Sequence, residues 1–305
     1  MTIDWNRWRP RLLYGAFTFA AFLLALRLTF PADAVKQRIV LEAAARGWQV
    51  DMADVGPGGI AGIHAEGVTV EAASGLKVPL DELTASLRLL PLLTGRRSVA
   101  FDARLYDGEV EGTADLSGDE REIALAARGV DLSRALPLRK ASGLDLTGKL
   151  SGKVALTVPA APNGQPKGRI DVTVTEAGVN GGQLPVPGMT SGLALPKLGL
   201  GELVAAVKLD QGKATFEKLE ARGGDADFTA DGLYAVLQPR IEYAPISGKA
   251  KLKVKDAFWA RRETQAFKGV AEAALASSRG RDGAWNFQIA GSVSRPQLRP
   301  VQGGQ

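Results

Sequence analysis

The chain has 305 residues, a formal net charge of +5 and no cysteine, which excludes disulfides, thiol catalysis and cysteine-ligated metal. Aromatic residues make up only 6% of the chain and no dense block of lysine and arginine occurs, so the composition argues against a nucleic-acid-binding protein. The 36 glycines and 16 prolines are spread along the chain, which is typical of many short elements joined by turns.

An apolar stretch near the start of the chain predicts a membrane anchor. The run from Leu12 to Leu26 contains no charged residue, and Arg27 precedes a last apolar group that ends at Phe30. A helix over residues 12–30 would be about 28 Å long, close to the thickness of the hydrocarbon core of a bilayer. The long side chain of Arg27 can carry its charge to the headgroups. These features predict a tail over residues 1–11, a transmembrane helix over 12–30 and one domain over 31–305.

A cleaved export signal is the alternative interpretation of the same stretch. Arginines precede the apolar run, and Ala32-Asp33-Ala34 fits the A-x-A pattern of a cleavage site. Arg27, Phe30 and Pro31 separate the run from that site, which is unusual for a cleaved signal, so the pattern favours a retained anchor. Basic residues flank both ends of the run, and their distribution therefore does not orient it. A short tail that stays in the cytoplasm, with the large domain exported, is the commoner arrangement.

The segment after the anchor predicts one helix. Pro31 and Asp33 fit its start, and Gly47 fits its C-terminal stop. The apolar side of this helix is expected to comprise Val35, Ile39, Val40, Leu41 and Ala43 or Ala44. Beyond it the periodicity changes to a two-residue alternation that continues through most of the chain. Only small helical pieces are expected there, near residues 91–95 and 131–136.

The alternating segments predict a mainly β protein with roughly a dozen or more short strands. Asp107-Gly108 is a strong hairpin signal within residues 98–118. A parallel sheet would need long crossover connections, for which the sequence leaves little room. We therefore expect a long, curled, mostly antiparallel sheet with a few short helices. The proline- and glycine-rich residues 158–168 are the best candidate for an internal hinge.

Many small aliphatic residues lie on the apolar faces of the predicted strands. A long sheet with one apolar face must bury that face against itself, a partner or a lipid. An ordinary sandwich or rolled-sheet core is one interpretation. A surface that holds acyl chains is the other.

Residues 143–150, GLDLTGKL, have the spacing of a phosphate-binding loop but lack its chemistry. Leu150 occupies the position at which Mg²⁺ binding needs Ser or Thr. The alternation of Leu144 and Leu146 with the later Val154 predicts a strand, a turn and a second strand. A phosphate loop would instead connect a strand to a helix.

Residues 223–232 contain the D-x-D-x-T pattern of aspartyl-phosphate phosphatases. In a strand, the polar residues Asp225, Asp227, Thr229 and Asp231 would share one face, so a solvated polar face explains the pattern.

The only histidine, His64, lies beside Glu66 on one predicted strand face, with no nucleophile pattern nearby. It is interpreted as a surface or edge residue, and residues 118–122, GDERE, as a charged hairpin tip. We therefore expect no enzyme, no catalytic residue, no cofactor and no metal ligand.

The order of these segments resembles the type II secretion system protein N family, which is in turn similar to AsmA-like proteins. The resemblance covers nearly the whole chain and rests on the style and order of its segments. These are FPADAVKQRI after the apolar run, LPLLTGRRSVAFDARLYDGEVEG, LTGKLSGKVALTV, LEARGGDADFTADG and the closing IAGSVSRPQLRP.

The resemblance implies a single-pass protein of the bacterial inner membrane with a retained anchor, a cytoplasmic N-terminus and a periplasmic β domain. Such a protein would be a non-enzymatic accessory of the type II secretion apparatus. Its partners would be other secretion-system proteins, in the inner-membrane platform or the outer-membrane secretin, reached through strand edges and loops. The AsmA-like relationship implies the alternative of a lipid-binding or lipid-transfer protein for outer-membrane maintenance, with acyl chains on the sheet.

Overall fold

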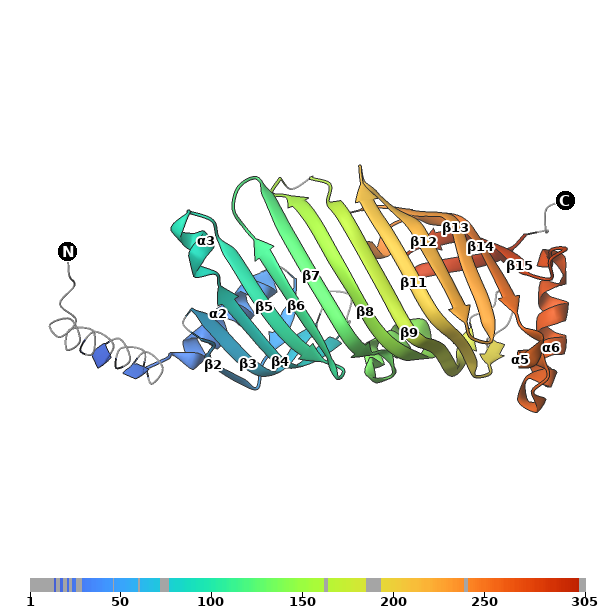
Figure 1. The fold of residues 1–305 in the computed structure, drawn as a ribbon, viewed down its shortest axis with the longest axis horizontal. Coiled ribbons are helices and arrows are strands. Elements are labelled where there is room, and N and C mark those ends of the chain that lie inside the picture. Colours follow the sequence, from blue (N-terminus) through green and yellow to red (C-terminus); the bar gives the residue numbers. More distant parts are fainter. Residues whose placement is uncertain are drawn as a thin grey trace, which may run out of the picture.

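A computed structural model describes residues 14, 17–18, 21, 24–25, 29–45, 47–59, 61–71, 77–161, 164–184, 193–238 and 241–301. Most of these residues belong to one sheet of 16 strands, in which every strand pairs with its neighbour in antiparallel fashion. Figure 1 shows the sheet as a long, twisted band with helices near its two ends. The prediction of a mainly β, antiparallel protein with few helices is confirmed.

The strands follow one another across the sheet almost in chain order. The order is β1-β3-β4-β5-β6-β7-β8-β9-β11-β12-β13-β14-β15-β16, with β2 also paired to β3 and β10 to β9. The strands are β1 (Gln49–Asp51), β2 (Asp54–Pro57), β3 (Gly62–Glu71), β4 (Lys77–Leu87), β5 (Ser98–Leu105), β6 (Gly108–Asp115), β7 (Glu120–Asp131), β8 (Leu144–Pro159), β9 (Lys167–Leu184), β10 (Leu193–Leu195), β11 (Leu198–Asp210), β12 (Lys213–Gly223), β13 (Ala226–Val236), β14 (Ile246–Val254), β15 (Trp285–Ser292) and β16 (Arg295–Pro300).

The helices are short and lie between strands or before the first one. They are α2 (Ala32–Ala45), α3 (Leu89–Leu93), η1 (Leu132–Arg134), α4 (Leu136–Ser142), η2 (Ile241–Tyr243), α5 (Asp256–Trp259), α6 (Arg262–Leu275) and η3 (Ala276–Ser278). The predicted helical pieces near residues 91–95 and 131–136 correspond to α3 and to η1 with the start of α4. The helices α5 and α6 were not predicted.

The strand register places the large apolar side chains on one face of the sheet. Side chains alternate between faces along a strand, and paired residues on neighbouring strands share a face. Following these rules from β4 to β15, the shared face carries Leu83, Phe101, Val110, Leu125, Val154, Ile170, Val207, Phe216, Phe228, Leu252 and Phe287. We call this the apolar face.

The opposite, polar face carries ion pairs that connect different strands of the sheet. Arg104 of β5 lies 3.2 Å from Glu82 of β4, and Arg169 of β9 lies 2.7 Å from Glu217 of β12. Between β13 and β14, the acidic Asp227 and Asp231 stand opposite Lys253 and Lys249 in the register. Exposed pairs of this kind each contribute about 0.5 kcal/mol or less, so they indicate a solvated face rather than a core.

Two separate hydrophobic clusters bury the two ends of the apolar face. At the first end, Val35, Ile39 and Val40 of α2 pack against a cluster formed by Met52, Val55, Ala65 and Val68. The helix prediction is therefore confirmed, although the expected apolar side is wrong for Leu41, which is 66% exposed. The reason is geometric: a helix packed on a sheet contacts it through one stripe of its surface, and Leu41 lies outside that stripe.

At the second end, α6 and the last strands curl over the apolar face. The buried cluster there combines Ala230 and Leu233 of β13 with Ala271 of α6 and Trp285, Phe287 and Ile289 of β15. Phe216 and Leu219 of β12 pack against the same cluster, although β13 and β14 separate β12 from β15 in the sheet order. The sheet must therefore curl, and β15 passes behind β12–β14 in Figure 1.

The predicted strand–turn–strand at residues 143–150 is wrong. Gly143 has a φ of 71° and ends α4, and β8 then runs continuously from Leu144 through Gly148 to Pro159. Gly148 has a φ of 123° and lies at a register shift between β8 and β9, so it marks a bulge inside a strand.

The hairpin between β5 and β6 is confirmed, one residue earlier than Asp107-Gly108. Its two turn residues are Tyr106 and Asp107, with φ values of 49° and 60°. Positive φ at both positions is the type I′ geometry that fits the twist of a two-residue hairpin. Of the predicted charged tip at residues 118–122, residues 118 and 119 lie in the connection between β6 and β7, and residues 120–122 begin β7.

Most of the predicted transmembrane segment lies outside the described residues, including Leu12, Leu26 and Arg27. Within it, Tyr14, Phe17 and Leu24 are helical and more than half exposed, whereas Phe30 packs against the cluster beneath α2. Among the helices that the structure describes, none combines the length and hydropathy needed to cross a membrane. The candidate hinge at residues 158–168 includes the last two residues of β8, the connection to β9 and the first two residues of β9, and the two strands pair up to Thr157 and Lys167.

Candidate functional site

His64 and the aspartates near residue 225 lie far apart in the sheet. His64 is on the polar face of β3, where its Nδ1 is 2.9 Å from Thr84 Oγ1 and its Nε2 is 3.5 Å from Glu66 Oε1. Asp225 precedes β13, and eight strands separate β3 from β13 in the sheet order. The structure therefore does not bring these residues into one site.

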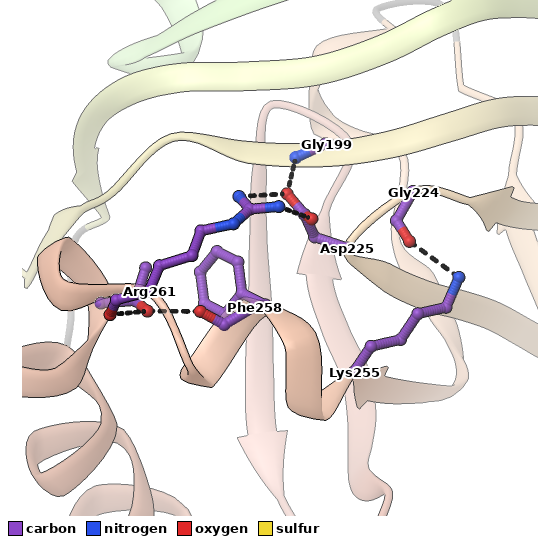
Figure 2. A network of polar contacts seen from close by, with 7 residues as sticks. Gly199, Gly224, Asp225, Lys255, Phe258 and Arg261 are labelled. Carbon is purple, nitrogen blue, oxygen red and sulfur yellow. Dashed lines mark hydrogen bonds and ion pairs between the residues drawn. The ribbon is translucent and has the colours of Figure 1, made fainter.

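Asp225 joins the start of β11 to the helices α5 and α6 (Figure 2). Its Oδ2 accepts hydrogen bonds from Gly199 N–H at 2.9 Å and from Arg261 Nη1 at 3.0 Å, and its Oδ1 accepts one from Arg261 Nη2. Backbone hydrogen bonds connect the same segments. The Asp225 N–H donates to Gly199 O, and the Lys255 N–H donates to Asp225 O. Lys255 Nζ donates to Gly224 O at 2.7 Å.

This environment keeps the Asp225 carboxylate ionised. Desolvation by burial alone would raise the pKa of Asp225, but the hydrogen bonds from Arg261 and Gly199 and the positive charges of Arg261 and Lys255 outweigh it. The pKa of Asp225 therefore lies below its ordinary value. Asp225 therefore acts as a structural clamp, because Gly199 and Arg261 supply the hydrogen-bond partners of its carboxylate.

The other aspartates and Thr229 of the D-x-D-x-T pattern behave as the alternation predicts. Asp227, Thr229 and Asp231 stand opposite Lys253, Lys251 and Lys249 on the polar face. Ala226 and Ala230, by contrast, are buried.

A shallow hollow with several charged residues in its lining lies where η1 meets β8, β9 and β11. Its lining includes Asp131, Ser133, Lys149, Glu176 and Lys197. Hydrogen bonds from the side chain and backbone of Ser133 lower the pKa of Asp131, which makes this carboxylate a poor base. Within the described part of the chain, no group of three or more His, Cys, Asp or Glu side chains could hold a metal ion.

The central part of the apolar face is the largest feature with no structural explanation. From β5 to β11 many side chains on this face are half-buried, including Phe101, Leu125, Val154, Ile170 and Leu203, whereas Ala103, Val174, Val207 and Leu209 are buried. The two clusters of buried apolar side chains lie towards the two ends of the sheet, beneath α2 and α6. Between these two clusters, the described helices η1 and α4 lie next to β8, and Arg134 of η1 pairs with Asp107 in the turn between β5 and β6 at 2.7 Å.

The sheet ends at β16, and prolines limit hydrogen bonding along its free edge. The N–H of Val301 donates to Asn286 O of β15, so the odd-numbered residues of this edge direct their N–H groups inward. The even-numbered positions, which face outward, are Pro296, Leu298 and Pro300. Only Leu298 can therefore offer an N–H to an added strand.

The edge at β1 and β2 is also poor in free donors. The N–H groups of Met52 and Val55 donate to the side chains of Asp51 and Asp54, each at 2.9 Å. Pro57 has no N–H to donate. Lys36 of α2 also covers this edge, because its Nζ donates to Met52 O. Both ends of the sheet are thus protected against the addition of a further strand.

Comparisons with models of protein families, with curated protein sequences and with solved structures found no match for this chain.

Proposed function

We propose that this chain is a non-enzymatic lipid-binding protein that holds acyl chains against the central part of its apolar face. The observation that carries the proposal is the continuity of this face from β5 to β11, with half-buried aliphatic and aromatic side chains between two capped ends. A continuous apolar surface that the fold leaves only partly buried is a candidate binding site. The proposal agrees with the AsmA-like relationship that the sequence suggests.

The dimensions and the chemistry of the face support acyl chains as the occupant. Strands lie about 4.8 Å apart, so the distance from β5 to β11 is about 24 Å along the sheet, which is long enough to contact most of an extended acyl chain. Glycines interrupt the larger side chains: Gly112 lies beside Phe101 and Leu125, and Gly152 beside Val172. A surface of this kind offers dispersion contacts and no polar group, which suits hydrocarbon.

The test is whether the protein retains lipid, and a pair of neighbouring residues on β8 provides a matched comparison. The full chain is purified in mild detergent, and the lipid that stays bound is extracted and measured by mass spectrometry. Val154 lies on the apolar face, and Ala155 lies on the polar face of the same strand. We expect Val154→Glu to lose most of the retained phospholipid, because a charge next to hydrocarbon is strongly unfavourable, and Ala155→Glu to retain it.

Circular dichroism and a denaturant titration establish that both variants are folded. Equal lipid content in the two folded variants, or no phospholipid in the unaltered protein, would contradict the proposal.

A secretion-system accessory is a second candidate, favoured by a different surface. Ile241 and Tyr243 of η2 are 52% and 59% exposed at the connection between β13 and β14, which suits contact with a partner protein. Because both sheet edges are protected, such a partner would bind strand-end loops rather than add a strand. Ile241→Asp with Tyr243→Asp should then abolish co-purification with other secretion components without changing the retained lipid. Unchanged co-purification would contradict this contact.

A further inference from the structure

The connection between β4 and β5 exposes a group of leucines to solvent. We define the leucine tip as Leu87, Leu89, Leu90, Leu92 and Leu93 together with Leu116 of the neighbouring connection. Leu90 and Leu93 are 80% and 85% exposed, and the other four are between 46% and 49% exposed. Single exposed leucines are common on protein surfaces, but a cluster of six needs an explanation.

The leucine tip is an ordered structure. The N–H groups of Gly95 and Arg96 donate to Leu92 O and Pro91 O, at 3.0 Å and 2.9 Å, and close the last turn of α3. The N–H of Leu116 donates to Arg97 O at 2.8 Å, and the N–H of Arg97 donates to Ser117 Oγ. These bonds attach the tip to the β6–β7 connection, so the leucines are held outward by the fold.

Basic residues surround the leucines. Residues 87–97 contain three arginines, Arg88, Arg96 and Arg97, and no acidic residue. Arg96 pairs with Asp115 at 2.6 Å and lies 3.9 Å from Glu122. Arg88 and Arg97 are exposed and form no ion pair with any residue that the structure describes. Apolar side chains next to unpaired arginines match the two layers of a membrane surface, in which anionic headgroups lie above hydrocarbon.

The position of the tip agrees with contact to a bilayer. In Figure 1, α3 lies at the same end of the long sheet as the beginning of α2, where the chain leaves the apolar N-terminal segment. A bilayer that holds this segment would therefore lie near the leucine tip. Leu87 also belongs to β4, whose Ala85 and Leu83 continue onto the apolar face.

We propose that the leucine tip is a membrane-docking site that inserts Leu90 and Leu93 into the surface of a bilayer containing anionic lipid. The exposed leucines enter the boundary between headgroups and acyl chains, while Arg88 and Arg97 contact the anionic headgroups. This site goes beyond the proposed acyl-chain binding and does not depend on it. The two proposals can fail separately, because the retained lipid is measured in detergent and docking is measured on vesicles.

The experiment places an environment-sensitive fluorophore in the tip of the full-length protein. The chain has no cysteine, so Leu90→Cys provides a single labelling site, and Ala257→Cys on the exposed side of α5 provides a matched site at the other end of the sheet. Each labelled protein is incorporated into vesicles of phosphatidylcholine with or without phosphatidylglycerol. We expect the label at residue 90, and not the label at residue 257, to shift to shorter wavelength and to be quenched by brominated acyl chains.

The arginines are tested in the same assay. Arg88→Gln and Arg97→Gln should each lower the ratio of docked to undocked tip by about fivefold on vesicles with phosphatidylglycerol, and high salt should have a similar effect. Leu93→Glu should abolish the shift; because this side chain is 85% exposed, the substitution should leave the fold intact.

Two results would overturn the proposal. One is an unchanged spectrum of the label at residue 90 on vesicles with phosphatidylglycerol, with the protein folded and incorporated. The other is a shift that rises with protein concentration in the absence of vesicles, which would identify a second copy of the chain as the occupant of the tip.

Discussion

Asp225 and Arg261 hold two distant parts of the chain together with a small number of atoms. The Asp225 side chain is 17% exposed and forms an ion pair with Arg261, which directly precedes α6. The guanidinium carbon of Arg261 also lies 5.6 Å from the centre of the Phe258 ring. We expect Arg261→Met to destabilise the protein by about 1.5 kcal/mol, because it leaves a largely buried carboxylate without its charged partner. Hydrogen exchange should show faster opening of α5 and α6, and the denaturant midpoint should fall.

The pH dependence of this effect follows from the lowered pKa of Asp225. A carboxyl whose folded-state pKa lies below its unfolded value, about 3.9, stabilises the fold fully above that pH. Its contribution is lost as the pH falls through the folded-state pKa. The difference between Arg261→Met and the unaltered protein should therefore be large at neutral pH and should shrink in acid. Arg262→Met, at an exposed neighbouring position, is the control, and an equal loss in both variants would count against the clamp.

Tyr106 carries a buried hydroxyl with no hydrogen-bond partner among the described residues. Desolvation by burial raises the pKa of this phenol. We expect Tyr106→Phe to stabilise the protein by about 1 kcal/mol, because it removes a desolvated polar group and keeps the ring in the turn. A denaturant titration measures the change, with Tyr243→Phe, whose side chain is exposed, as the control. A loss of stability would indicate that the hydroxyl is satisfied in solution.

At the scale of single elements, the strands were predictable and two of the helices were not. The two-residue alternation identified the strands because one face of each contacts solvent and the other carries apolar side chains. The helix α6 also has a visible signal, since Phe267, Ala271 and Leu275 recur at helical spacing. This signal was missed because the segment lies between strands of a chain that alternates almost throughout.

The prolines of β16 make a prediction about assembly. We expect Pro296→Val with Pro300→Val to produce concentration-dependent self-association, because the variant would restore two outward N–H groups on a strand whose residues are all exposed. Sedimentation in detergent or chemical cross-linking measures the change. Gln297→Val is the matched control, because it adds a β-branched residue at a position whose N–H faces β15. A variant that stays monomeric at high concentration would show that the prolines do not protect this edge.

At the scale of the whole molecule, the helices cover only the two ends of the apolar face of the sheet. The helices α2 and α6 bury the two ends, and the curl of β15 over β12–β14 adds to the second cluster. The centre of the apolar face, from β5 to β11, belongs to neither of these two clusters. Because a ligand that binds only the folded state stabilises it, an occupant of this partly buried centre should raise the free energy of unfolding, which is the basis of the lipid test on Val154.

The sequence by itself determined the strands, the antiparallel arrangement, the first helix after the apolar run and the absence of a recognisable catalytic motif. These features depend on local periodicity and on turn residues such as Tyr106 and Asp107, which act over a few positions of the chain. The apolar N-terminal segment and the secretion-system or lipid-handling role stay predictions.

Only the tertiary structure decided which apolar residues are buried, because burial depends on where each strand lies in the sheet. Val154 and Phe287 have similar patterns in the sequence, yet Phe287 is buried beneath α6 and Val154 is not. The clamp between Asp225 and Arg261, the protected edges and the outward direction of the leucine tip also depend on contacts between distant residues. Such contacts form when the strands pair and the sheet curls, and no local pattern encodes them.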